Sequence, residues 1–137
     1  MNNTDNKKAV FINYSNHPSA MWSAAQRSAA EEYGEIVDLE FRRISSTDGK
    51  EDIRRQAQEE FHRIMERHPV AVMCQGEFTL TYALVQMLQQ AGIPVLVACS
   101  ERSAEEHLDE HGNSVKTSLF RFVRFREYPR MIRNEVG

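Results

Sequence analysis

The chain has 137 residues, of which 41 % are hydrophobic and 27 % are charged. This length allows one hydrophobic core rather than two, and the composition is that of a folded protein rather than a disordered one. The net charge of -3 excludes a general nucleic-acid coat, whose domain would be basic. We therefore expect a single domain over residues 1–137, with residues 1–7 as a flexible tail and no duplex nucleic acid as a partner.

No apolar run approaches the roughly 20 residues that a membrane-spanning helix needs, and the start, MNNTDNKK, lacks the apolar core of a signal peptide. We expect a cytoplasmic protein without a membrane partner. Cys74 and Cys99 each end an apolar run and show neither Cys-x-x-Cys spacing nor an accompanying His pattern. Reduced, buried thiols are therefore expected rather than a disulfide, and neither a metal nor a cofactor is expected.

The first half of the chain alternates strand-like and helix-like segments. The β-rich residues 8–15, KAVFINYS, predict a strand, and the alanine-rich residues 22–33 predict a helix that stops before a glycine. Residues 35–41, EIVDLEF, predict a second strand. An apolar stripe at helical spacing then predicts a helix over residues 51–68.

The second half continues the alternation. Residues 70–74 are continuously apolar, as are strands covered on both faces, and residues 78–91 carry apolar side chains at helical spacing. Residues 94–99 form another apolar strand. Short connections between alternating strands and helices favour right-handed crossovers. The sequence therefore predicts an α/β fold with a Rossmann-like, mostly parallel sheet flanked by helices.

The last third departs from this pattern. A turn signal at His111-Gly112-Asn113 is followed by β-rich residues, which predicts a C-terminal β-hairpin extension at the sheet edge. A helix over residues 103–110 is the alternative. From Lys116 to Arg133 six cationic residues stand against the single acidic residue Glu127, so this end of the molecule could attract an anion.

Ligands of open parallel sheets bind outside the carboxyl ends of the strands, where helices begin. Three expected strand ends carry polar residues, and their convergence is the main functional signal. The end of the second strand, LEFRRI, is interpreted as solvated surface. The polar ends are Ser15-Asn16-His17-Pro18-Ser19, Gln75-Gly76-Glu77 and Ser100-Glu101-Arg102.

The first of these loops holds a histidine, a side chain that exchanges protons near neutral pH. His17 is therefore a candidate acid or base. The alternative is a surface cap, in which Asn16 or Ser19 accepts hydrogen bonds from free helix N–H groups. Trp22, one turn on, is either a core residue or a platform on which a base stacks.

The second loop, CQGEFTLT, combines several ways of meeting a ligand. Gly76 lets backbone approach closely, Glu77 suits a helix N-terminus, and Thr79 can cap the helix or donate to a phosphate. Capping leaves Gln75 unexplained, and an amide at a strand end commonly contacts a base, ribose or phosphate. The chain has neither GxxxxGK[ST] nor GxGxxG, which argues against a P-loop and a dinucleotide site.

The third loop adds a hydroxyl from Ser100 and a guanidinium from Arg102. Arg102 could grip a phosphate, or it could form a surface ion pair with Glu101 that stabilises little. Lys116 could line the same region from the hairpin, although strand alternation sends neighbouring cations to opposite faces. No GxSxG elbow is present, which argues against a Ser-His-Asp hydrolase.

The segments FINYSNHPS and YGEIVDL, with a downstream Gln in a small Rossmann-like domain, resemble the compact CARF-like accessory proteins of type III CRISPR systems, the ring nuclease group. The resemblance implies a homodimer that binds a cyclic oligoadenylate across its two-fold axis, with cyclic tetra-adenylate as the first ring to consider. It also implies ring opening without a metal, to linear products with 2',3'-cyclic phosphate ends, which ends the signal.

On this resemblance His17 would shuttle the proton while hydroxyl, amide and guanidinium groups hold the ring. Three alternatives stay open: a sensor or sponge that only binds the ring, a small-nucleotide transferase or glycosidase with Glu77 as nucleophile, and a structural subunit whose basic hairpin docks on a partner. The expected catalytic residues are His17, Ser15 and Asn16, and the expected ligand-binding residues are Ser19, Trp22, Gln75, Gly76, Glu77, Thr79, Ser100, Glu101, Arg102 and Lys116.

Overall fold

The computed structural model describes residues 8–131, so the expected tail at residues 1–7 lies outside the described residues. Five strands form one sheet in the order β2-β1-β3-β4-β5, with β1 to β4 parallel and β5 antiparallel to β4. The predicted α/β class, the mostly parallel sheet and the C-terminal hairpin are confirmed. The strands are β1 (Val10–Ser15), β2 (Glu35–Glu40), β3 (Ala71–Gln75), β4 (Val95–Leu108) and β5 (Ser114–Glu127).

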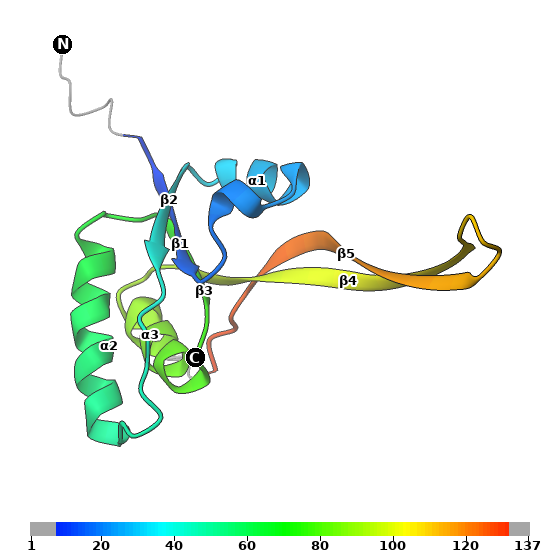
Figure 1. Ribbon diagram of the computed structural model, residues 1–137. Helices are drawn as coiled ribbons and strands as arrows, with labels where there is room; N and C mark the ends of the chain where they lie inside the picture. The colour runs from blue at the N-terminus through cyan, green and yellow to red at the C-terminus, as the bar shows by residue number, and fades with distance from the viewer. Residues whose placement is uncertain (1–7, 132–137) are drawn as a thin grey trace, which may run out of the picture.

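Helices cover both faces of the sheet. α1 (Ala24–Glu31) lies on one face, while α2 (Lys50–Met65) and α3 (Phe78–Gln90) lie side by side on the other (Figure 1). The sequence of β1 produces this division, because successive side chains of a strand point to opposite faces. Ile12 belongs to the core under α2 and α3, and Phe11 to the core under α1.

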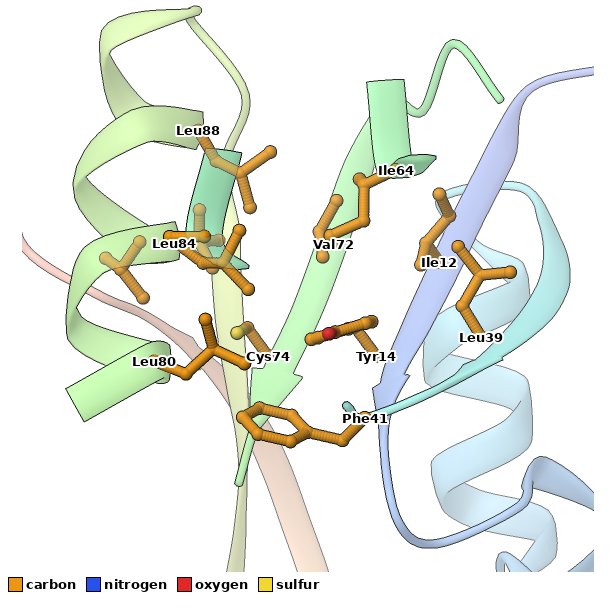
Figure 2. Packing of buried hydrophobic residues seen from close by; sticks show 13 residues of the cluster. Ile12, Tyr14, Leu39, Phe41, Ile64, Val72, Cys74, Leu80, Leu84 and Leu88 are labelled. Carbon is orange, nitrogen blue, oxygen red and sulfur yellow. The ribbon is translucent and has the colours of Figure 1, made fainter. Parts of the chain in front are cut away.

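The larger core fills the space between the sheet and the α2–α3 pair. Figure 2 shows Tyr14 and Cys74 on neighbouring strands, with Phe41 below them and Leu80 and Leu84 extending from α3 toward the strands. Each of these side chains is at most 4 % exposed, and full burial of a large apolar side chain stabilises a fold by roughly 1.5–3 kcal/mol. This core therefore fixes the positions of β1 and β3, whose ends carry the polar loops.

Two helix boundaries differ from those predicted from the sequence. α1 begins at Ala24 rather than Trp22, because the Ser23 hydroxyl caps the helix by accepting from the N–H of Gln26 at 3.2 Å. α2 ends at Met65, before the expected 68, and His68 has a left-handed backbone with φ of 50°. Within residues 8–131 none of the helices has the length and apolar character needed to cross a membrane.

The most extended element is a ribbon made by the far parts of β4 and β5. The strand expected over residues 94–99 runs on to Leu108, and the helix considered for residues 103–110 is wrong. Residues 100–122, named the arm below, project away from the body of the protein (Figure 1). The register shifts between Cys99 and Ser100, and such bulges bend a strand and increase its twist.

Candidate functional site at the carboxyl rim of the sheet

The carboxyl ends of β1 and β3 lie side by side at the centre of the sheet. Ser15 pairs with Gln75 in the parallel register, so the first two predicted loops emerge next to each other. β2, which follows β1 in the chain, lies on one side of β1, whereas β3 and β4 lie on its other side, so the strand order reverses at β1. Such a reversal of strand order is where doubly wound sheets bind their ligands. The two loops therefore flank the expected binding crevice.

The backbone of His17 is held by the residues before it. The Asn13 amide donates to the His17 carbonyl at 2.8 Å, and the His17 N–H donates to the Ser15 hydroxyl at 3.1 Å. That hydroxyl in turn donates to the Asn13 side-chain oxygen at 2.7 Å. Asn13 and Ser15 are buried, whereas His17 is exposed. The loop thus presents the imidazole from a backbone whose direction is fixed.

The interpretation of LEFRRI, the end of the second strand, as solvated surface is wrong for Leu39 and Phe41, which are buried. Asp38, which precedes this segment on β2, completes the network. Its carboxylate accepts from the Asn13 amide at 3.0 Å and from the N–H and hydroxyl of Ser19 at 3.1 and 3.2 Å. Ser19 therefore anchors the loop to β2 and does not cap α1. Sequence reasoning missed Asn13 and Asp38, although an amide inside the apolar run VFINYS was a usable signal.

Gln75 and Gly76 have structural partners at the rim. The Gln75 side-chain oxygen accepts from the N–H of Ala98 at 2.7 Å, which ties β3 to β4 where the strands begin to part. Gly76 lies so close to the ring of Phe41 that any Cβ would overlap with it. Beside the exposed imidazole of His17, the Gln75 amide nitrogen and the exposed side chain of Asn16 can meet a ligand at this rim.

Glu77 and Thr79 belong to a different surface. The Glu77 carboxylate caps α3 by accepting from the N–H of Leu80 at 2.8 Å, and Thr79 donates to the same carboxylate. Both residues line a groove of about 1140 Å³ between α2 and α3, which no residue of the Ser15–Ser19 loop lines. Glu77 and Thr79 therefore face this groove, which His17 does not line.

Trp22 packs into the smaller core. Its ring centroid lies 6.4 Å from that of Phe11 and 6.2 Å from that of Phe125, and the side chain is half-buried. Much of the indole surface is thus occupied by contacts between α1, β1 and β5. Of the two roles expected for Trp22, the role of a core residue accounts for this position.

The remaining predicted residues lie on the arm at increasing distances from the rim. Ser100 and Glu101 follow the bulge, and the Arg102 guanidinium donates to the Ser118 hydroxyl at 3.1 Å. Lys116 pairs with Glu106, eight residues past Ala98, which places it about 26 Å along the arm at 3.3 Å per residue. Within one chain, Ser100 to Arg102 adjoin the rim and Lys116 does not.

A buried polar cluster beneath the rim was not foreseen. The Tyr14 hydroxyl donates to the Glu60 carboxylate at 2.6 Å and accepts from the N–H of Arg42 at 3.2 Å. Arg63 pairs with the same carboxylate at 2.8 Å. Burial, and then the bond to Glu60, raise the pKa of Tyr14 above its ordinary value of 10.0. The cluster links β1, α2 and the segment after β2, and so braces the rim from below.

The two thiols are free and differ in environment. Cys74 is buried and Cys99 is half-buried. Burial raises the pKa of Cys74 from 9.0 to about 12. The Tyr128 hydroxyl donates to the Cys74 carbonyl at 3.0 Å, which brings the chain after β5 back under the sheet. Among residues 8–131 no group of three or more His, Cys, Asp or Glu side chains is placed to hold a metal ion.

The sequence matches the family described as "Uncharacterized protein MJ1673 family" over residues 9–126. The chain belongs to this family. The match to the MJ1673 family runs from the start of β1 almost to the end of β5, and so includes the His17 loop, Gln75 and the whole arm. A search of curated proteins gave no match to the chain.

Proposed function

We propose that this MJ1673 family member is a cytoplasmic ring nuclease of a type III CRISPR system. In this proposal two copies bind a cyclic oligoadenylate, foremost cyclic tetra-adenylate, and open it without a metal to linear products with 2',3'-cyclic phosphate ends. The sequence support is the resemblance of FINYSNHPS and YGEIVDL to that group. The geometric support is one observation, the hydrogen-bonded His17 backbone where the carboxyl ends of β1 and β3 lie side by side.

This arrangement suits a reaction that depends on positioning. In ring opening, a ribose 2'-oxygen attacks the adjacent phosphorus, the bond from phosphorus to the 5'-oxygen breaks, and one proton moves from the 2'-hydroxyl to the 5'-oxygen. A histidine that is exposed to solvent on a hydrogen-bonded backbone can accept or deliver that proton, and Asn16 and the Gln75 amide nitrogen can donate to phosphate oxygens. Arg102 and Ser100 adjoin the rim from the arm and supply further donors.

The test is incubation of the protein with labelled cyclic oligoadenylates in EDTA, followed by separation of cyclic and linear products. We expect linear product from the wild type, and a rate about 10²–10⁴-fold lower for His17→Ala, the usual contribution of a general acid or base. His62→Ala is the matched control, because His62 is an exposed histidine on α2 and should leave the rate unchanged.

Two outcomes would change the proposal. Tight binding without linear product would favour a sensor or sponge that only sequesters the ring. Full turnover by His17→Ala would remove His17 from the mechanism and leave the enzyme proposal to other residues.

A second candidate is a transferase or glycosidase that uses Glu77 on a small nucleotide. It is favoured by the position of Glu77 beside the α2–α3 groove of about 1140 Å³. Against it, the carboxylate is already engaged by the N–H of Leu80 and the hydroxyl of Thr79. Loss of nucleoside turnover in Glu77→Gln, with cyclic oligoadenylates untouched by the wild type, would select this candidate.

A further inference from the structure

The arm has no covering layer within its own chain. None of residues 100–122 is buried, and the apolar side chains of Leu108 and Phe120 are 71 % and 73 % exposed. A two-stranded hairpin is marginally stable in water unless further strands or another layer pack on it. We therefore expect another surface to pack against an arm of this length.

The strand register sorts the arm's side chains onto two faces, because residues directly opposite each other point to the same side. One face holds both phenylalanines of the arm, and we name it the Phe face. Its cross-strand pairs are Ser100–Phe122, Arg102–Phe120, Ala104–Ser118, Glu106–Lys116 and Leu108–Ser114. The opposite face is formed by the pairs Glu101–Arg121, Ser103–Leu119, Glu105–Thr117 and His107–Val115.

The arm is also charged in opposite ways at its two ends. The tip, residues 105–116, has an excess of acidic residues. The root, taken together with the adjoining end of β5 as residues 100–104 and 117–127, has an excess of basic residues. An acidic tip repels a polyanion, so the charge pattern does not suit a nucleic acid lying along the whole arm. The tip carries Glu105, Glu106, Asp109 and Glu110 against Lys116, and the root carries Arg102, Arg121, Arg124 and Arg126 against Glu101 and Glu127.

On the Phe face this contrast is carried by Arg102 near the root and Glu106 near the tip, and turning one copy around brings these opposite charges together. In a two-fold pair each contact occurs twice, so the tip of one arm on the root of the other satisfies both ends. We propose that two copies of this chain dimerise by packing their Phe faces together in such an antiparallel, two-fold arrangement. This inference deepens the proposed function and rests on it for the choice of a two-fold pair.

The residues of the Phe face fit this arrangement. Its middle pair is Ala104–Ser118, and two small side chains at the axis allow the two arms to approach closely. With the axis there, Arg102 of each copy lies opposite Glu106 of the other, and Ser100 opposite Leu108. The tip of the second copy also comes to lie beside the root, and hence beside the carboxyl rim where the ring is proposed to bind.

Sedimentation of the ligand-free protein tests the pairing. The wild type should have about twice the chain mass of 15.9 kDa, and Ala104→Arg should return it to the mass of one chain because bulk and charge at the axis are doubled. Thr117→Arg is the matched control, since Thr117 is an exposed residue of the opposite face and should leave the dimer intact. A monomeric wild type, or equal loss of the dimer in both variants, would overturn the proposal.

Cross-linking tests the two-fold axis itself. In a Cys99→Ser background, Ala104→Cys should form a disulfide with its own counterpart on mild oxidation, whereas Thr117→Cys should not. Covalent dimers from Thr117→Cys alone would overturn the assignment of the Phe face. Both experiments are carried out without ligand, so a failure of ring binding or cleavage is distinguishable from a failure of dimerisation.

Discussion

The ring of Phe41 occupies the space that a side chain at position 76 would need. Phe41 is only 4 % exposed and Gly76 begins the turn between β3 and α3, so neither can move without disturbing the rim. We predict that Gly76→Ala lowers the free energy of unfolding by about 1–3 kcal/mol, the usual cost of overpacking a core. Urea denaturation measures this loss.

Two further variants separate packing from other effects of that substitution. Gly49→Ala should cost much less, because the nearest atom to a Cβ there is 3.9 Å away. Adding Phe41→Leu to Gly76→Ala should recover part of the lost stability by vacating the space. If the loss of unfolding free energy in the double variant equals the sum of the losses in the two single variants, the overlap with Phe41 is not the cause of the Gly76→Ala effect.

Asn13 on β1 should be more important for stability than Asn16, the exposed asparagine of the loop that follows this strand. Its buried amide donates to both the His17 carbonyl and the Asp38 carboxylate. We predict that Asn13→Ala costs about 1–3 kcal/mol, as expected when buried acceptors lose their donor. Asn16→Ala should stay within about 0.5 kcal/mol of the wild type, because its side chain is exposed. Equal effects in thermal or urea unfolding would contradict the anchoring role of Asn13.

The raised pKa of Tyr14 predicts that the protein loses stability at alkaline pH. The pKa of Tyr14 is 10.0 in the unfolded chain and higher in the folded protein, so the folded protein keeps this proton to a higher pH. The stability that this difference contributes is therefore complete below pH 10. It decreases as the pH rises above that value. Tyr14→Phe should flatten the dependence of the unfolding free energy on pH in this range. An unchanged slope would show that other groups cause it.

The two cysteines should react with a thiol reagent at different rates. Only the thiolate reacts, and the pKa of Cys74 is raised to about 12 by burial, whereas Cys99 is half-buried near the arm. We predict that an aromatic disulfide reagent labels one thiol readily at pH 8 and the second only when the protein unfolds. Cys99→Ser should remove the faster reaction. Rapid labelling of that variant under native conditions would contradict the burial of Cys74.

Where sequence reasoning went wrong, a contact between distant segments was responsible. The segment LEFRRI is interpreted from the sequence as solvated, yet its Phe41 is buried and packs on Gly76, and Asp38 just before it anchors the first loop. The parallel registers of β1 with β2 and with β3 make these contacts, and no local sequence pattern states those registers. Glu77 and Thr79 were expected beside His17, but α3 carries them toward the α2–α3 groove.

The amino-acid sequence by itself determined the alternation of strands and helices, the apolar central strands, the turn at residues 111–113 and the polar character of the strand ends. These features depend on local propensity and periodicity, which act between near neighbours. Only the tertiary structure decided which strand ends meet, that the hairpin extends into an unsupported arm, and that Asn13 and Asp38 fix the His17 loop. These features depend on the strand order and register, which bring together residues that are far apart in the chain.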